Sequence, residues 1–297
     1  MKRKYIFSAG ILGIFFMIIS QLSFAINDSV VKLIVQESNT TTSILNVIFI
    51  RGLITTFIIY LYLSLVEGKK ITKIVKNFNY HKRGIFEVLT AFCFLTALVL
   101  LPVAEVYTLL MTNPFFVTIF AFFFLKEKVG FKRWCAVLVG FIGVIIVINP
   151  TNFTFNPLFI LPILAAIFLT IRDVRTKNIA TKSNSFEIIF ITSLLITFFS
   201  GIGSLFIEFN LESNSLIKIV ISSFFLTVAY IFSVLTVFYA PLSLTASSRY
   251  SVIIFGIIFG YLILGEVPNY TMLSGALVIS LSGLFVIKRQ KDLGKIE

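Results

Sequence analysis

The sequence predicts an all-α integral membrane protein with ten transmembrane helices in two inverted five-helix repeats. Of its 297 residues, 58% are hydrophobic and only 13% are charged, which is more apolar side chain than a single soluble core can bury. Runs of roughly 20 apolar residues, the length that crosses a bilayer core about 30 Å thick, follow one another along the chain. Two stretches 139 residues apart also resemble each other, although their charges differ.

Ten apolar runs define the predicted spans. They cover residues 6–26, 44–66, 84–101, 104–125, 134–149, 155–171, 188–207, 219–239, 241–264 and 272–287. The sixth is the least regular, because Pro157 lies near its start and Pro162 interrupts it, and proline removes a helical hydrogen bond. The longest loop, residues 67–83, leaves no room for a soluble catalytic or nucleotide-binding domain.

Lys and Arg are distributed very unevenly between the loops. Of 25 Lys and Arg, 21 lie in the two terminal segments and in the second, fourth and sixth loops, which a ten-span topology places on one side. Cytoplasmic loops collect Lys and Arg, so we expect both termini to be cytoplasmic and the protein to lie in the cytoplasmic (inner) membrane. This orientation explains the net charge of +12. No nucleic-acid-binding motif accompanies the charge, so no nucleic-acid partner is expected.

The repeat is carried by four residues in each half. Pro102, Leu125, Glu127 and Val129 recur as Pro241, Leu264, Glu266 and Val267, the last one residue early. The first Leu-x-Glu turn, LKEKVGFKR, contains four Lys or Arg and the second, LGEVPNYTM, contains none, so the two turns are predicted to face opposite sides of the bilayer. The repeats then cover residues 1–149 and 150–297 within a single membrane domain. Inverted repeats of this kind are the ground plan of many secondary transporters.

Few ionisable residues lie inside the predicted spans, and such residues usually face a cavity or a partner. Arg249 lies well inside the ninth span, and its repeat counterpart is Leu110, so the repeat does not require a charge there. Its guanidinium suits a carboxylate or a phosphate. The alternative is a structural partner for Glu87, Asp28 or backbone carbonyls. Tyr250 is expected either to line the same path or to pack.

Asp28 is the second candidate. With Lys32 it ends the first predicted span, and Asp173 with Lys177 repeats the same i to i+4 spacing at the end of the sixth. Asp28 is expected to pair with Lys32, to pair with Arg51 of the second span, or to bind a cationic group of a substrate. Arg51 is interpreted either as its counterion or as a further substrate contact.

Neutral polar residues lie near the middle of several spans. In the fourth span Pro114 follows Asn113 near mid-membrane, where proline removes a helical hydrogen bond and frees the carbonyl of Leu110. Such a break either borders a binding site or is a packing kink. The same space is expected to be lined by Tyr107, Thr108 and Tyr230, while Asn27 adds a neutral hydrogen-bonding group beside Asp28.

Neither a cofactor nor a metal site is predicted. The single histidine, His81, lies in a basic loop, Cys93 and Cys135 lie inside predicted helices, and no cluster has metal-ligand spacing. No nucleophile elbow, P-loop or dinucleotide-binding turn appears, so the sequence does not predict an enzyme. Gly256 and Gly260 form a GxxxG motif, which permits close packing within the monomer or, alternatively, a homodimer seam.

Six motifs distributed over essentially the whole chain carry a family resemblance. They are FAINDSVVK, VIFIRG, PVAEVYTLLMTNPFFVTIFAFFFLKEKVGFKRW, GFIGVIIVINP, APLSLTASSRY and GYLILGEVPNYTMLSGALVISLSGLFVIKR. With them the chain resembles the EamA-type carriers of the drug/metabolite transporter superfamily. The resemblance implies ten helices in two inverted halves. It also implies a central cavity bordered mainly by spans one, three, four, six, eight and nine, with spans five and ten at the periphery.

Within the superfamily, the chain is similar to S-adenosylmethionine carriers. This resemblance implies substrate-contacting residues at Asn27, Asp28, Arg51, Asp173, Arg249 and Tyr250. The sequence departs from those carriers at residues 246–248, where they have a more proline-bearing stretch, and at Glu105, where they have a neutral residue.

These features predict a secondary transporter that moves a small polar, zwitterionic metabolite, amino-acid-like or S-adenosylmethionine-like, by alternating access. Arg249 and Tyr250 are expected to hold a carboxylate, while Asp28 or Asp173 meets an amino or sulfonium group. The expected partners are this small-molecule substrate and the lipid bilayer. Two alternatives are an exporter of lipophilic or aromatic compounds, with a cavity lined by Phe and Tyr, and a non-transporting membrane subunit that scaffolds a partner.

Overall fold

Within the residues that the structure describes, every regular element is a helix. The structure is a computed structural model, and it describes residues 2–37, 44–123, 130–149, 156–180, 184–207, 213–239 and 247–292. Four of the repeat residues noted above lie outside these ranges: Leu125, Glu127, Val129 and Pro241.

The long helices follow the order of the predicted spans. Their bounds are α1 (Lys2–Glu37), α2 (Ile44–Leu61), α4 (Phe78–Leu100), α5 (Val103–Leu110), α6 (Asn113–Phe123), α7 (Phe131–Ile148), α8 (Ile160–Ala180), α9 (Ser185–Ser204), α10 (Ser213–Tyr239), α12 (Ser251–Leu264) and α13 (Tyr270–Asp292). Short helical segments complete the chain: the π-helix η1 (Tyr62–Val66), α3 (Ile71–Val75), and the 3-10 helices η3 (Pro157–Phe159) and η4 (Ser247–Tyr250).

Eight helical segments of the described chain are long and apolar enough to cross a membrane. They cover residues 11–37, 44–66, 78–100, 103–120, 157–176, 186–204, 215–233 and 270–289. Two shorter apolar helices, Trp134–Ile148 and Ser248–Leu264, coincide with the predicted fifth and ninth spans. The protein is therefore a multi-pass membrane protein.

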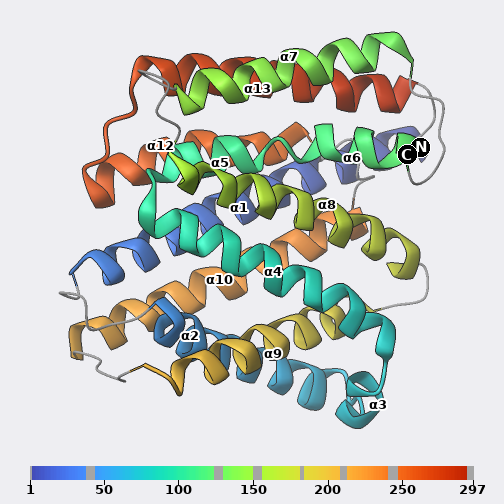
Figure 1. The fold of residues 1–297 in the computed structure, drawn as a ribbon. Helices are drawn as coiled ribbons and strands as arrows, with labels where there is room; N and C mark the ends of the chain where they lie inside the picture. The colour runs from blue at the N-terminus through green and yellow to red at the C-terminus, as the bar shows by residue number, and fades with distance from the viewer. Residues whose placement is uncertain are drawn as a thin grey trace.

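The most extensive helix contacts each keep a counterpart when the first five predicted spans are exchanged with the last five. Helix α1 packs on α10 and α12, and correspondingly α8 packs on α4 and α5. Helix α4 also packs on α9, as α10 does on α2. The pairs α2 with α9, α5 with α12, and α7 with α13 each join equivalent helices of the two halves. Figure 1 shows α7 and α13 along one edge of the bundle and α2 and α9 along the opposite edge, with α1, α4, α5, α8, α10 and α12 between them.

The first span differs from its prediction. It was expected to cover residues 6–26 and to be ended by Asp28 and Lys32, but α1 continues to Glu37. Both charged residues lie inside the helix and are buried, 4% and 3% exposed respectively. The predicted span was ended before these two residues because an unpaired charge inside the hydrocarbon is costly. Asp28 and Lys32 have partners that offset part of that cost, and the helix does not stop there.

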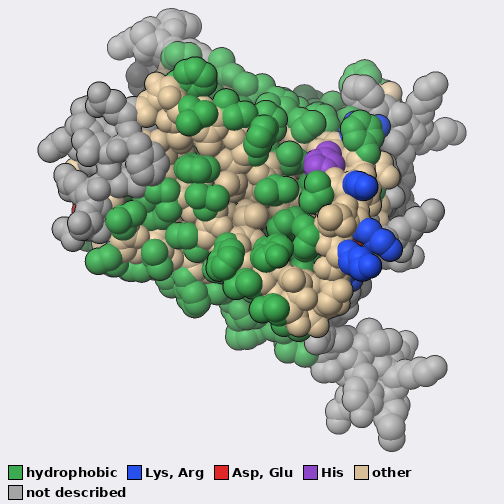
Figure 2. Space-filling model, turned by 90° about the horizontal axis from the view of Figure 1, so that it is seen from below, with side chains coloured by type: hydrophobic (Ala, Val, Ile, Leu, Met, Phe, Trp, Pro, Cys, Tyr) green, Lys and Arg blue, Asp and Glu red, His purple; other side chains and the backbone are tan. Residues whose placement is uncertain are grey.

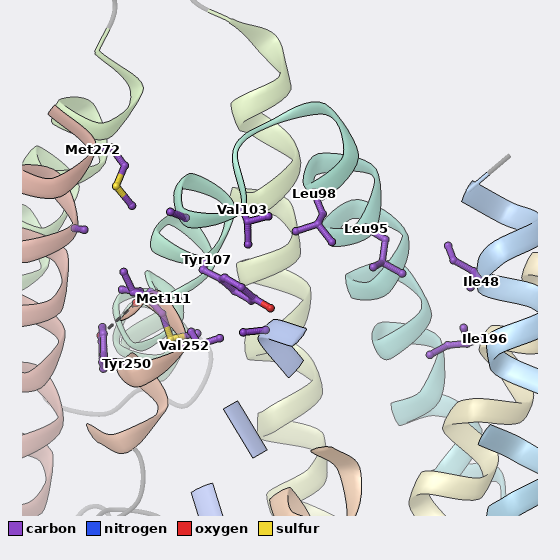
Figure 3. Packing of buried hydrophobic residues seen from close by; sticks show 14 of the residues in the cluster. Ile48, Leu95, Leu98, Val103, Tyr107, Met111, Ile196, Tyr250, Val252 and Met272 are labelled. Atoms are coloured by element: carbon purple, nitrogen blue, oxygen red, sulfur yellow. Dashed lines mark hydrogen bonds between the residues drawn. The ribbon is translucent and has the colours of Figure 1, made fainter. Parts of the chain in front are cut away.

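The prediction of a break in the fourth span is confirmed. α5 ends at Leu110 and α6 begins at Asn113, so the chain leaves α-helical geometry just before Pro114, which has no amide hydrogen to donate. In the second half η4 gives way to α12 at Tyr250. The Tyr250 hydroxyl donates to the carbonyl of Met111, 139 residues away, at 3.2 Å, and the two residues lie side by side in Figure 3. The two irregular points therefore touch each other.

The sixth span is also present. Pro157 starts η3 and Pro162 lies in the first turn of α8. Amide groups of a first helical turn have no intrahelical acceptor, so a proline there removes no hydrogen bond. The helix then continues without interruption to Ala180.

Glycines bring several helices into close contact within the monomer. A Cβ added at Gly275 of α13 would lie 2.8 Å from the carbonyl oxygen of Gly143 of α7. A Cβ added at Gly256 of α12 would lie 2.5 Å from the ring of Tyr107. Gly260, the partner of Gly256 in the GxxxG motif, faces Val103 and Glu266. In this structure the motif therefore serves packing within the chain.

The surface of the bundle is apolar along its length and basic at one end. Figure 2 shows hydrophobic side chains over most of one face, with Lys and Arg gathered at one end of it. Large exposed apolar residues include Phe57 at 59%, Phe198 at 60% and Phe224 at 60%. Side chains of this kind, distributed over a whole face, fit contact with lipid tails rather than with water.

Candidate substrate-binding site

A buried carboxylate lies at the centre of the candidate site. Asp28 of α1 accepts one hydrogen bond from the Tyr107 hydroxyl of α5, at 2.6 Å, and one from the Asn27 side-chain amide, also at 2.6 Å. Hydrogen bonds to an ionised acceptor are stronger than neutral ones and offset part of the cost of burying the charge. Two donors thus hold Asp28 in one orientation.

A guanidinium lies next to this carboxylate and is connected to it through Asn27. Arg51 of α2 donates to the Asn27 side-chain oxygen at 3.2 Å, and Ser222 of α10 donates to the same oxygen at 2.7 Å. Asn27, Arg51 and Ser222 are 1%, 5% and 0% exposed. Four helices, α1, α2, α5 and α10, therefore contribute to one polar group, which we call the central group: Asn27, Asp28, Arg51, Tyr107 and Ser222.

The position of Tyr107 depends on small and aromatic neighbours. Its ring packs against Phe94 with centroids 5.7 Å apart, and Gly256 leaves the space that the ring occupies. The ring lies inside the largest apolar cluster of the structure, as Figure 3 shows. Only a residue with an apolar body and a polar tip can fill that space and still reach Asp28.

A second polar group, the terminal cluster, lies towards the end of the bundle that carries both termini in Figure 1. Its members are Arg83, Glu87, Arg172, Asp173 and Arg249. Glu87 contacts Arg83 at 2.8 Å and Arg172 at 2.9 Å, and Asp173 contacts Arg172 at 2.6 Å. Arg249 of η4 reaches Asp173 through one pair of atoms 3.5 Å apart. Three guanidinium groups thus face two carboxylates.

A third ion pair lies near the opposite end of the bundle. Lys32 of α1 contacts Glu266 at 2.5 Å and also donates to the carbonyl oxygen of Leu101. Glu266 in turn accepts from the amide of Val103 at 2.7 Å. Glu105 and Glu266 line a cavity of about 230 Å³ between α5 and α12. The pair fastens α1 to the start of α5 and to the turn between α12 and α13.

The structure brings four of the nine predicted site residues together in the central group: Asn27, Asp28, Arg51 and Tyr107. Arg249 and Asp173 lie together in the terminal cluster. Tyr230 of α10 packs its ring edge-on against Phe24 of α1, and Arg51 and Glu87 both lie within electrostatic range of its hydroxyl. The two remaining residues lie in neither group.

Asn113 and Tyr250 are those two residues, and each joins one helix to another. The Asn113 amide donates to the Thr170 hydroxyl at 3.0 Å, joining α6 to α8. Tyr250 donates to the backbone of Met111, and a Cβ on Gly283 would collide with its hydroxyl. In this conformation both side chains are engaged in contacts between helices.

Of the alternatives left open for Asp28 and Arg249, the structure selects particular partners. Lys32 pairs with Glu266, and the donors to Asp28 are Tyr107 and Asn27. Arg249 pairs with Asp173 rather than with Glu87.

Sequence reasoning did not single out Arg83, Arg172, Ser222 or Glu266 as site residues. Arg172 was discernible, because it directly precedes Asp173 in an apolar helix. Arg83 was interpreted as part of a basic loop, and Glu266 was interpreted as part of a turn. Nothing in the sequence distinguishes Ser222, since hydroxyl side chains are common in apolar helices and usually form hydrogen bonds with the backbone of the same helix.

Comparisons with known proteins agree with this architecture. Residues 11–149 match the profile of the EamA-like transporter family. A solved crystal structure superimposes on the chain with a TM-score of 0.63, covering 96% of this chain and 98% of its own, at 14% sequence identity. At that identity the match shows the fold alone.

Three relatives have names that include a transported substrate. The S-adenosylmethionine uptake transporter of Rickettsia bellii is 26% identical over 94% of both chains. The pseudopaline exporter of Pseudomonas aeruginosa is 21% identical over 94% of this chain and 97% of its own. The riboflavin transporter of Vibrio cholerae is 37% identical, but over only 33% of each chain.

The family match covers the first half of the chain, and the full-length similarity to transporters extends it to the second. The multi-pass helical bundle with buried ionic groups fits both. The chain is therefore similar to EamA-like transporters in residues 11–149 and to proteins named as transporters along its whole length.

Proposed function

We propose that this transporter moves a small polar, zwitterionic metabolite, amino-acid-like or S-adenosylmethionine-like, across the cytoplasmic membrane by alternating access. The chain crosses the membrane ten times, in inverted halves formed by residues 1–149 and 150–297, and both termini are cytoplasmic. The substrate is bound between the halves, near the central group.

The packing of the helices supports the proposed repeat. Each of the most extensive helix contacts has a counterpart when the two proposed halves are exchanged. The irregular points of the fourth and ninth spans, at Met111 and Tyr250, are separated by the 139 residues of the sequence repeat and contact each other. A pseudo-twofold axis through that contact accounts for both facts, and binding sites of inverted-repeat transporters lie beside broken helices at such an axis.

The observation that carries the substrate class is the pair of opposite charges buried together in the central group. Asp28 and Arg51 are at most 5% exposed and are held by neutral donors and acceptors. A cationic amine or sulfonium is attracted by Asp28, and a carboxylate by a guanidinium. A zwitterion carries both kinds of group and adds no net charge to the membrane interior.

Arg249 is the proposed ligand of the substrate carboxylate. Its contact with Asp173 is 3.5 Å long, whereas Arg172 contacts the same carboxylate at 2.6 Å. Arg172 can therefore keep Asp173 neutralised while a substrate carboxylate takes the place of the longer contact. The relative named for S-adenosylmethionine uptake supports a substrate with a carboxylate, an amine and a sulfonium.

Uptake into proteoliposomes tests this function. We expect labelled S-adenosylmethionine or a zwitterionic amino acid to accumulate in vesicles with the transporter, and Arg249→Ala to abolish uptake. Arg175→Ala is the matched control, because Arg175 lies on α8 near the same end and stacks on the ring of Phe86. Uptake that survives Arg249→Ala would contradict the assigned role. Flux confined to apolar aromatic compounds would favour the lipophilic exporter, and absence of any flux would favour the scaffold subunit.

A further inference from the structure

One basic cavity lies outside the central group, the terminal cluster and the Lys32–Glu266 pair. It has a volume of about 150 Å³ and lies where η1, α3 and α4 meet the start of α9. Its lining includes Lys69, Lys70, Lys73, Tyr80 and Glu187. This volume accommodates several water molecules, each occupying about 30 Å³ in the liquid, and therefore a phosphate group.

The cavity has one neutralised lysine and two unpaired ones. Lys69 contacts Glu187 at 2.6 Å, and the Tyr80 hydroxyl donates to the other oxygen of that carboxylate at 2.9 Å. The hydrogen bond with Glu187 raises the pKa of Lys69, which therefore stays charged at neutral pH. Lys70 and Lys73 are exposed, and their ammonium groups make no ion pair or hydrogen bond with the residues that the structure describes. The lining therefore carries an excess of positive charge.

Large apolar side chains close in sequence to the residues that line this cavity are exposed. Leu65 and Val66 at the end of η1 are 76% and 70% exposed, and Phe78 at the start of α4 is 67% exposed. Figure 2 shows Lys and Arg gathered at one end of a face that is otherwise covered with hydrophobic side chains. A soluble anion gains nothing from contact with exposed apolar side chains, whereas the acyl chains of a membrane lipid pack against them.

We propose that this cavity binds the phosphate headgroup of an anionic membrane lipid, with the headgroup between Lys70 and Lys73 and the acyl chains along Leu65, Val66 and Phe78. Lysine clusters beside a membrane span attract anionic lipids. The choline of a zwitterionic lipid would bring a cation next to these lysines and is disfavoured. The site is distinct from the transport path and is independent of the transported solute.

Native mass spectrometry of the full-length chain, released from detergent with equal amounts of phosphatidylglycerol and phosphatidylcholine, tests the proposal. We expect wild type to retain phosphatidylglycerol at least about tenfold better than phosphatidylcholine. The double variant Lys70→Gln, Lys73→Gln should lower phosphatidylglycerol retention about thirtyfold, from the loss of two lysines at the membrane surface. Lys70→Arg, Lys73→Arg keeps both charges and should retain the lipid.

The matched control is Lys76→Gln, Lys132→Gln. Both residues are exposed, and neither lines the cavity, so the variant removes the same charge from the same end of the bundle. Its phosphatidylglycerol retention should stay within about twofold of wild type. Equal losses in both double variants would show diffuse surface attraction and overturn the proposal, as would no loss in either. Displacement of the lipid by equimolar soluble glycerol phosphate would identify a site for free phosphate instead.

Discussion

At the scale of single residues, the buried charges of this bundle each have polar or charged partners. Asp28 has Tyr107 and Asn27, and Lys32 has Glu266. A buried ion pair contributes little net stability, but removal of one partner leaves an uncompensated charge and is costly. Substitutions that remove only one partner should therefore have large and position-dependent effects.

Tyr107→Phe tests the support of Asp28. The variant keeps the ring in its apolar space but removes the hydroxyl that donates to the carboxylate at 2.6 Å. We expect a loss of about 1–3 kcal/mol in the free energy of unfolding, the cost of leaving a buried polar group short of a partner. Thermal unfolding in detergent measures it.

The control for this variant is Tyr261→Phe, which removes a hydroxyl from a side chain that is 59% exposed on α12. Its stability should equal that of wild type within about 0.5 kcal/mol, as for surface substitutions in general. Equal losses in the two variants would mean that the contact between Tyr107 and Asp28 does not hold the central group.

Glu266→Gln and Glu105→Gln form a second matched pair. Both carboxylates line the same cavity, but Glu266 pairs with buried Lys32, whereas Glu105 makes no ion pair with the residues that the structure describes. Glu266→Gln should cost about 3 kcal/mol, because it leaves the Lys32 charge buried without its counterion. Glu105→Gln should be neutral or slightly stabilising, since it removes a charge that repels Glu266. Thermal unfolding that ranks the two variants in the opposite order would refute this pairing.

At the scale of helices, the apolar runs of the sequence predicted each long helix because a membrane span needs only length and hydropathy. The break before Pro114 was predictable for a similar local reason, the missing amide hydrogen. The end of α1 was not, because whether Lys32 stops a span depends on Glu266, which lies 234 residues further along the chain. In the same way Asp28 and Arg249 were recognisable as candidates, but their partners Tyr107 and Asp173 are set by packing between helices.

Close helix crossings give the third stability test. A methyl group at Gly275 would lie 2.8 Å from the carbonyl oxygen of Gly143 and 2.9 Å from the amide nitrogen of Val147. Backbone atoms cannot rotate away, so α7 and α13 must separate. We expect Gly275→Ala to cost about 1–3 kcal/mol through overpacking.

Gly130→Ala is the matched control, because nothing lies within 4 Å of the added Cβ and the backbone there has an ordinary φ of −70°. This variant should unfold at the wild-type temperature. If Gly275→Ala also unfolds there, α7 and α13 are not in backbone contact.

At the scale of the whole molecule, three ionic groups occupy successive levels of one apolar bundle. The terminal cluster and the Lys32–Glu266 pair lie towards opposite ends, with the central group between them. A transporter that works by alternating access must open each end in turn while the other stays closed. Both outer groups are formed here, so each end of this conformation is held together by ion pairs.

In the proposed inverted repeat the two halves cross the membrane in opposite directions, and labelling of equivalent positions tests this directly. Gly130 and Asn269 are 139 residues apart, and each lies just outside a helix. In a chain with Cys93 and Cys135 replaced by Ala, a cysteine at position 269 should react with a membrane-impermeant maleimide in intact cells. A cysteine at position 130 should react only after permeabilisation. Labelling of both positions from the same side would contradict the inverted repeat and, with it, the proposed path between the halves.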